Sequence, residues 1–281
     1  MPHIVLQSFG NIPIHVTANI KKVVEECYRE LEPHAVKLLD LLLFENQMRM
    51  NSYYASEKKA SGVASEMLSE RFFAVHDAWR GISRIGVCLE NVTQLSELVQ
   101  IGALRHEVGH SVLHGSVEHY VFSAPQLLLE AERKFRLGRD FSLSLLYLIS
   151  MAVKDFEVTK LLAEKGYVED QLAYSSHVLA ASEDDLAAWR MAEGNLAAEA
   201  LCAVSRLKDA ASTIAISQFL QRSPAEKLKE ELSYLPDMIL ERFLRLTEAL
   251  SKCVAGETLH NVNAAVRSFV EIFLEPSHAT L

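Results

Sequence analysis

Cysteine is scarce in this sequence and never occurs in a close pair. The four cysteines among 281 residues are Cys27, Cys88, Cys202 and Cys253, and no two of them form a C-x-x-C pair. This spacing excludes a local zinc ribbon and supplies no disulfide framework. We therefore expect free thiols, as in proteins of a reducing cytoplasm.

Basic residues are in deficit, with 28 Lys and Arg against 37 Asp and Glu and a net charge of −9. No basic stripe occurs along the chain, so we expect no nucleic-acid partner. The acidic balance favours solubility. A content of 49% hydrophobic and 23% charged residues is ordinary for a soluble globular protein.

Long apolar runs are also missing. The most apolar stretch, residues 143–153, has about 11 residues, whereas a helix that crosses a membrane needs about 20. Residues 1–7 lack the basic head and the long apolar run of a signal peptide. These observations predict a cytoplasmic protein with no membrane partner.

The most informative stretch is ALRHEVGHSV, residues 103–112, which contains an H-E-x-x-H motif. His106 and His110 are four residues apart, so on an α-helix both rings lie on one face and can bind a single zinc ion. Glu107 would then lie beside the metal, where it can take a proton from a zinc-bound water. This combination predicts metal-assisted hydrolysis.

The residues around the motif favour a buried helix over residues 94–114. Both x positions, Val108 and Gly109, are uncharged, as a helix packed inside a protein requires. We expect Thr93 to cap the start of this helix and Gly115 to end it. The alternative is an ordinary amphipathic helix with two solvent-facing histidines.

The motif and its flanks resemble those of zincin metallopeptidases. The resemblance implies that His106 and His110 bind zinc and that Glu107 is the general base. The long metzincin form has a third histidine six residues after the second, and this chain has Ser116 there. The third zinc ligand must therefore come from elsewhere in the chain.

His114 is the nearest candidate for the third ligand, but helix geometry opposes it. His114 lies eight positions after His106, a rise of about 12 Å along a helix. Zn–N bonds are about 2 Å long, so one ion cannot reach both side chains. We expect His114 to cap the helix C-terminus or to lie just outside the metal ligands.

Better candidates lie in a second predicted helix, which starts near Phe141 and carries Asp155 and Glu157. Two positions turn an α-helix by about 200°, so the two carboxylates cannot both face one metal. The Asp155 side is otherwise apolar, with Leu148, Met151, Ala152, Val158 and Leu162. The Glu157 side is charged, with Lys154, Lys160 and Glu164.

We favour Asp155 as the third ligand, because a carboxylate on an apolar face needs a partner and a metal is a good one. A neighbouring Arg or backbone group is the alternative partner. Residues 152–158 also resemble the helix that supplies an aspartate ligand in small predicted prokaryotic metallopeptidases. Gluzincins take a glutamate from a downstream helix, which keeps Glu157 as the alternative ligand. Otherwise Glu157 is expected in a solvated surface ion pair.

The order of elements predicts an α+β fold whose small sheet precedes the motif helix. We expect strands at 3–7, 72–75 and 82–89, a helix at 17–32, a strand or helix at 36–44 and a loop at 47–64. In zincins an edge strand of this sheet binds substrate backbone. The resemblance assigns that role to Arg84, Ile85, Gly86, Val87 and Cys88. A plain internal strand is the alternative.

Two regions are predicted along the chain. Residues 1–166 would form a zincin-like core that includes the ligand helix, residues 141–165. Residues 167–281 show helical spacing of apolar residues and would form a mostly helical C-terminal region packed on that core. This region carries no recognisable chemistry, so it would cap the cleft or bind a protein partner.

A hydrolytic zinc site also needs a donor for the oxyanion that forms on the attacked carbonyl. The candidates are His119, Tyr120 and Tyr147, with His76 and Tyr167 as further options. The sequence thus predicts a zinc-dependent metallopeptidase that cleaves peptides or proteins and holds one Zn²⁺ per chain. The alternatives are a catalytically silent zinc-binding interaction protein and a zinc hydrolase of a non-peptide amide.

Overall fold

The computed structural model describes residues 1–60, 73–121, 123–253 and 256–275. It has a mixed α+β fold with a four-stranded sheet and a majority of helical residues, as the sequence predicts. The chain divides into two compact units. The first comprises Met1–Val121 with Lys165–Tyr174, and the second comprises Phe122–Glu164 with Ser175–Leu281.

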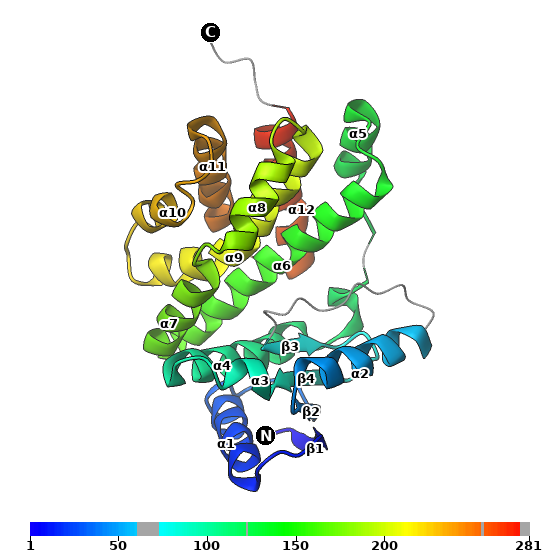
Figure 1. Ribbon diagram of the computed structural model, residues 1–281, viewed down its shortest axis with the longest axis vertical. Helices are drawn as coiled ribbons and strands as arrows, with labels where there is room; N and C mark the ends of the chain where they lie inside the picture. The colour runs from blue at the N-terminus through cyan, green and yellow to red at the C-terminus, as the bar shows by residue number, and fades with distance from the viewer. Residues whose placement is uncertain (61–72, 122, 254–255, 276–281) are drawn as a thin grey trace. The chain divides into compact units, whose positions relative to one another are not determined.

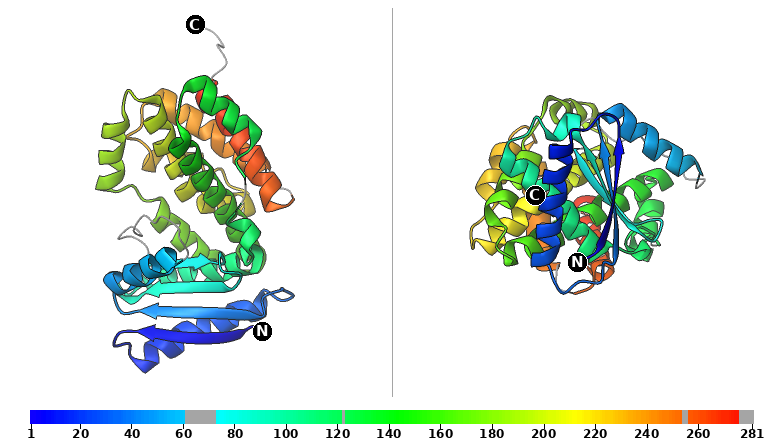
Figure 2. Two further views of the ribbon diagram at one scale, coloured as in Figure 1. Left: turned by 90° about the vertical axis from the view of Figure 1, so that its right-hand side faces the viewer. Right: turned by 90° about the horizontal axis from the view of Figure 1, so that it is seen from below.

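The sheet belongs to the first unit and has the strand order β1-β2-β4-β3 (Figure 2). Its strands are β1 (His3–Phe9), β2 (Leu38–Phe44), β3 (Ala74–Asp77) and β4 (Ser83–Cys88). The first three in that order run parallel, and β3 pairs with β4 in the antiparallel sense. The apolar run at 36–44 is thus a strand, and Phe72, expected in the third strand, lies outside the described residues.

The strand expected at an edge of the sheet is internal. β4 carries Arg84 to Cys88, and it pairs with β2 on one side and with β3 on the other. All six of its residues are buried, and the Arg84 side chain donates hydrogen bonds to Asp77 and Glu57. The prediction that this strand binds substrate by strand addition is therefore wrong, because its hydrogen-bonding edges are already used.

Helices cover both faces of this sheet. The first unit contains α1 (Ile14–Glu30), α2 (Gln47–Ala60), α3 (Leu89–Val92) and α4 (Glu97–His114). Gly86 of β4 faces Tyr54 of α2, whereas Ser83, three residues earlier, hydrogen-bonds to the Gly115 carbonyl after α4. Since alternate residues of a strand point to opposite faces, α2 and the end of α4 lie on opposite sides.

One of these helices contradicts the sequence prediction. Residues 47–60 form α2 where a loop was expected, and residues 61–64 of that expected loop lie outside the described residues. The helix is mostly polar, and it buries only Met50 and Tyr54 among its described side chains. These two residues are four apart, so they lie on one face and pack with Leu42 and Phe44 of β2.

The motif helix α4 is close to its predicted bounds. It begins after Ser96 rather than Thr93, because Thr93 instead ends the short helix α3. Gly115 ends it as predicted, although its φ of −75° is open to any residue. Space explains the glycine there: an added Cβ would lie 2.2 Å from the Ser111 carbonyl oxygen.

The chain returns to the first unit at Lys165–Tyr174, where α7 (Val168–Leu179) begins. Asp170 forms a salt bridge with Arg105 of α4. Gln171 donates a hydrogen bond of 2.9 Å to the Gly102 carbonyl. A Cβ at Gly102 would lie 2.4 Å from the backbone oxygen of Asp170, so this close approach requires glycine.

The second unit is entirely helical in its described residues. Its helices are α5 (Gln126–Phe135), α6 (Arg139–Glu164), the rest of α7, α8 (Glu183–Ala192), α9 (Leu196–Phe219), α10 (Ala225–Glu231), α11 (Asp237–Cys253), α12 (Thr258–Phe269) and the π-helical turn Val270–Leu274. The long helices α6 and α9 pack side by side (Figure 1). Their apolar faces form one core, which includes Ile149, Phe156, Leu207 and Phe243.

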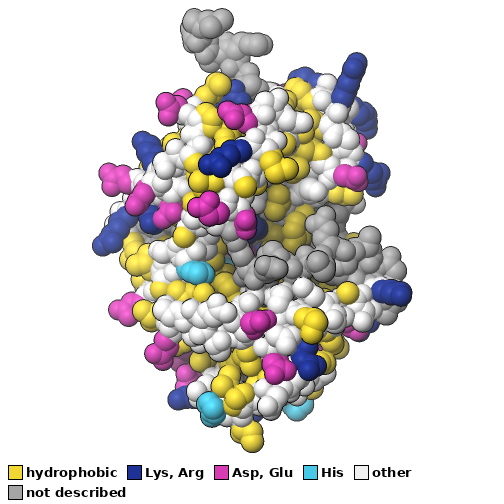
Figure 3. All heavy atoms as spheres, viewed as in Figure 1, with side chains coloured by type: hydrophobic (Ala, Val, Ile, Leu, Met, Phe, Trp, Pro, Cys, Tyr) yellow, Lys and Arg dark blue, Asp and Glu magenta, His cyan; other side chains and the backbone are white. Residues whose placement is uncertain are grey.

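This division differs from the predicted one at 166/167. The predicted ligand helix, α6, groups with the C-terminal helices because its apolar face packs on α9 and α12. Among the described residues, no helix is long and apolar enough to cross a membrane. On the face shown in Figure 3, basic and acidic side chains are intermixed.

Candidate metal centre

The H-E-x-x-H motif lies in the buried part of α4. His106, Glu107 and His110 are only 2%, 8% and 6% exposed. The burial arises because α4 packs against α1 and against strands β3 and β4. The alternative of solvent-facing histidines is therefore wrong.

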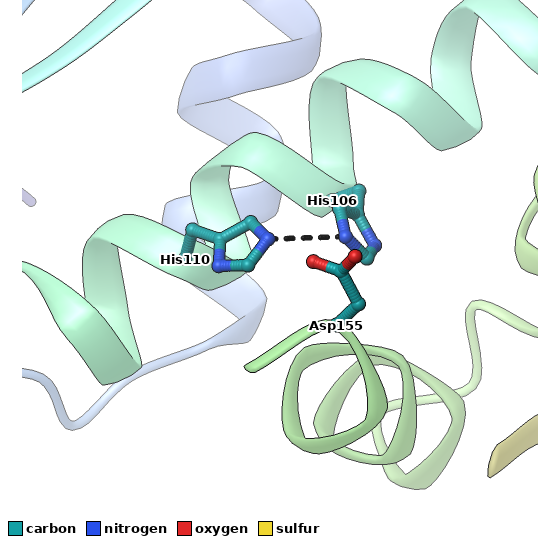
Figure 4. Close-up of side chains that lie close together, drawn as sticks. All are labelled: His106, His110 and Asp155. Carbon is teal, nitrogen blue, oxygen red and sulfur yellow. Dashed lines mark hydrogen bonds between the residues drawn. The ribbon is translucent and has the colours of Figure 1, made fainter. Parts of the chain in front are cut away.

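The two histidines present their Nε2 atoms to one another at 3.1 Å (Figure 4). The rings are 4.7 Å apart between centroids and inclined by 78°. Two ligands of a tetrahedral zinc ion with Zn–N bonds near 2.05 Å would lie about 3.3 Å apart. The observed separation thus fits two imidazole ligands of one metal ion.

Asp155 of α6 is the third side chain drawn in Figure 4. Together with His106 and His110 it supplies side-chain atoms of the kinds that bind metal ions. Two imidazoles and a carboxylate are a donor set that zinc accepts. Since Asp155 belongs to the second unit and the histidines to the first, its role as a ligand is part of the proposal below.

Glu157 has a different position from the one expected. It accepts hydrogen bonds from Thr258, at 2.8 Å, and from Asn261, at 2.5 Å, both on α12. Glu157 is thus half-buried rather than fully solvated as predicted, and these bonds join α6 to α12. No local pattern signals this contact, because the partners of Glu157 lie about 100 residues further along the chain.

Lys154, expected on a charged and solvated face, is buried with 5% exposure. Burial lowers its pKa, and the negative charges of Asp155 and Glu157 oppose that shift. Lys208 of α9 is also close to Asp155: although burial lowers its pKa, the charges of Asp209 and Asp155 raise it overall. Within the second unit, Asp155 thus lies among cationic side chains.

Tyr28 of α1 anchors the motif helix from one side. Its hydroxyl lies 2.5 Å from the Ser111 hydroxyl, which itself donates to the Val108 carbonyl. Ser111 must therefore accept the hydrogen of Tyr28. Burial raises the pKa of Tyr28, so this phenol keeps the proton it donates. The contact fixes the rotation of α4 at the position next to His110.

The oxyanion candidates are distributed over both units. In the first unit the Tyr120 hydroxyl lies 2.7 Å from Nδ1 of His76, whose ring stacks parallel to that of His110 at 6.1 Å. His119 packs its ring edge-on to His114 at 5.2 Å. Tyr147 belongs to α6 of the second unit and is 59% exposed.

Tyr167, a further option, stacks on Arg105 at 4.0 Å. Burial raises the pKa of Tyr167 to about 12, with smaller influences from nearby charges.

Two neighbours of the histidine pair were not assigned by sequence reasoning. The Tyr174 ring lies 4.8 Å from the His106 ring, and Nδ1 of His114 lies 3.2 Å from Nδ1 of His110. The second contact follows from the spacing of four residues on a helix. The contact between Tyr174 and His106 has no local signal in the sequence, because Tyr174 lies in the segment Lys165–Tyr174, far from α4 along the chain.

Comparisons of the chain with protein-family models, with curated proteins and with solved structures found no match.

Proposed function

We propose that this protein is a zinc-dependent peptidase whose metal ion is bound by His106, His110 and Asp155. The observation that supports it most is the buried imidazole pair on α4, with Nε2 atoms 3.1 Å apart and a buried glutamate beside it. Burying polar side chains is costly unless they are partnered, and a metal ion would be a shared partner for the two imidazoles. The resemblance of residues 103–112 to zincins favours a peptide bond as the substrate.

The protein residues would divide the chemistry between them. A bound zinc ion would supply Lewis-acid activation of a water molecule and of the carbonyl group that it attacks. Glu107 would accept a proton from the water and pass it to the leaving amine. Its burial on α4 keeps the carboxylate next to the ligands and limits its contact with bulk water.

Metal analysis of the purified protein tests the site. We expect about one zinc per chain in the wild type, and loss of that zinc in both His106→Ala and His110→Ala, since each removes one of three ligands. His15→Ala is the matched control, because His15 is an exposed residue of α1. Full zinc content in the His106 and His110 variants would refute the proposed site.

A further inference from the structure

His110 uses both of its ring nitrogens. Its Nε2 faces His106 at 3.1 Å, and its Nδ1 faces Nδ1 of His114 at 3.2 Å. His114 is in the last turn of α4 and is completely buried. A neutral imidazole carries one hydrogen, on either Nδ1 or Nε2, so the direction of the second contact depends on which nitrogen of His110 carries the hydrogen.

Only one of the two possible hydrogen positions suits metal binding. If His114 donates from Nδ1, His110 must accept at Nδ1 and carry its own hydrogen on Nε2, which blocks that atom as a ligand. If His110 donates from Nδ1, its Nε2 carries no hydrogen and presents a lone pair toward His106. His114 then accepts at Nδ1 and carries its hydrogen on Nε2.

We infer that His114 is a positioning residue, which accepts a hydrogen bond from Nδ1 of His110 and thereby holds Nε2 of His110 ready to bind the metal. The inference rests on the proposed metal site. Metal-bound histidines generally donate their other N–H to a nearby acceptor, and this bond sets ring orientation and tautomer. Here the acceptor is a second imidazole one helical turn away.

Neighbouring rings hold this arrangement in place. The His76 ring stacks on His110 with an angle of 4° between their planes, which restricts rotation of the His110 ring. The His119 ring meets His114 edge-on, with 75° between the planes. Both contacts lie within the first unit, so the orientation of His110 is set by the sheet and by α4 with the turn that follows it.

Two variants of His114 separate hydrogen bonding from packing. His114→Leu removes the acceptor and keeps a buried apolar side chain, whereas His114→Asn retains an oxygen near the position of Nδ1. We expect His114→Leu to weaken zinc binding by about 10–100-fold in a competition titration, the usual effect of losing such a partner. We expect His114→Asn to stay close to the wild type. His15→Leu is the control.

Nitrogen NMR of the metal-free protein near pH 8 provides a readout that packing alone would not change. We expect His110 to be the Nδ1–H tautomer in the wild type and in His114→Asn, and a mixture of tautomers in His114→Leu. If His114→Leu fails to fold, the wild type and His114→Asn still decide the question. An Nε2–H tautomer of His110 in the wild type would overturn the inference.

The titrations also separate this inference from the metal site itself. If His106→Ala and His110→Ala lose zinc while His114→Leu binds it as tightly as the wild type, the role of His114 is refuted and the site stands. If the first two variants keep their zinc, the site is refuted, and the role of His114 with it.

Discussion

The two units differ in what their central helices bury. In the motif half of α4, the first unit buries His106, Glu107, His110, Ser111 and His114. In the second unit, α9 buries a long series of Ala, Val, Leu and Ile, with few polar side chains among them. Burying polar groups costs free energy unless they are partnered. Their concentration on one helix supports the proposal that α4 holds a metal ion, whereas α9 contributes apolar side chains to the core.

Buried polar groups of the second unit tie its own helices together. Thr159 of α6 donates to Ser212 of α9 at 2.9 Å. Glu157 accepts from Thr258 and Asn261 of α12. Such hydrogen bonds contribute modestly to stability and select one packing arrangement. These polar groups of the second unit thus have structural roles, whereas α4 and Asp155 would carry the metal chemistry that we propose.

Glu107→Gln should have the largest effect. The amide cannot act as a base, so hydrolysis should fall by about 10²–10⁴-fold, while zinc content and thermal unfolding remain those of the wild type. Zinc analysis and a peptide-cleavage assay on the same preparations would measure this. If the wild type is active and Glu107→Gln cleaves the peptide at the same rate, Glu107 is not the base. The difference drawn above between α4 and the second unit would then no longer hold.

The variants Asp155→Ala and Glu157→Ala test whether Asp155 is the metal ligand that the second unit supplies. Losing Asp155 removes a proposed ligand and should weaken zinc binding by more than the about 10–100-fold typical of residues behind the ligands. Glu157→Ala should leave zinc affinity almost unchanged but lower the free energy of unfolding by about 1–3 kcal/mol, because Asn261 and Thr258 lose their acceptor. Zinc titration and urea unfolding of both variants decide this, and the reverse ranking in zinc affinity would assign the third ligand to Glu157.

Gly102→Ala should have the smallest effect and should act on the first unit. An added Cβ would lie 2.4 Å from the Asp170 backbone oxygen and 2.9 Å from Cβ of Tyr174. Backbone cannot move aside easily, so we expect a loss of about 1–3 kcal/mol from overpacking. Gly86→Ala is a useful comparison, because its nearest neighbour is the end of the Tyr54 side chain. If Gly102→Ala unfolds at the same denaturant concentration as the wild type, the segment Lys165–Tyr174 packs loosely against α4.

Local sequence patterns predicted the elements that carry the motif. The spacing of His106 and His110, with uncharged residues between, predicted a buried helix that ends at Gly115, and α4 ends there. Strands at 3–7, 72–75 and 82–89 were also predicted, whereas the apolar run at 36–44 was left open between strand and helix. These features depend on residues within one or two turns of each other, which is the range over which sequence patterns are informative.

The errors concern contacts between distant segments. The position of β4 inside the sheet depends on β3, which pairs with it, and nothing within residues 83–88 records that pairing. Glu157 looks like a surface residue until Thr258 and Asn261 are placed beside it. Helix α2 was missed because its sequence is mostly polar and, among its described side chains, only two apolar ones are buried, too few for a periodic pattern. Which carboxylate binds metal is a question of the same kind, and it stays a prediction.

The first unit is discontinuous in sequence, and this affects how the protein can be made. A ribosome releases residues 1–121 well before 165–174, so Arg105 and Gly102 are synthesised long before their partners Asp170 and Gln171. Domains ordinarily fold as units, the N-terminal one first, during synthesis. Here the first unit reaches its full set of contacts only once all of α6 has emerged, so a truncated gene ending after α4 would encode an unfinished unit.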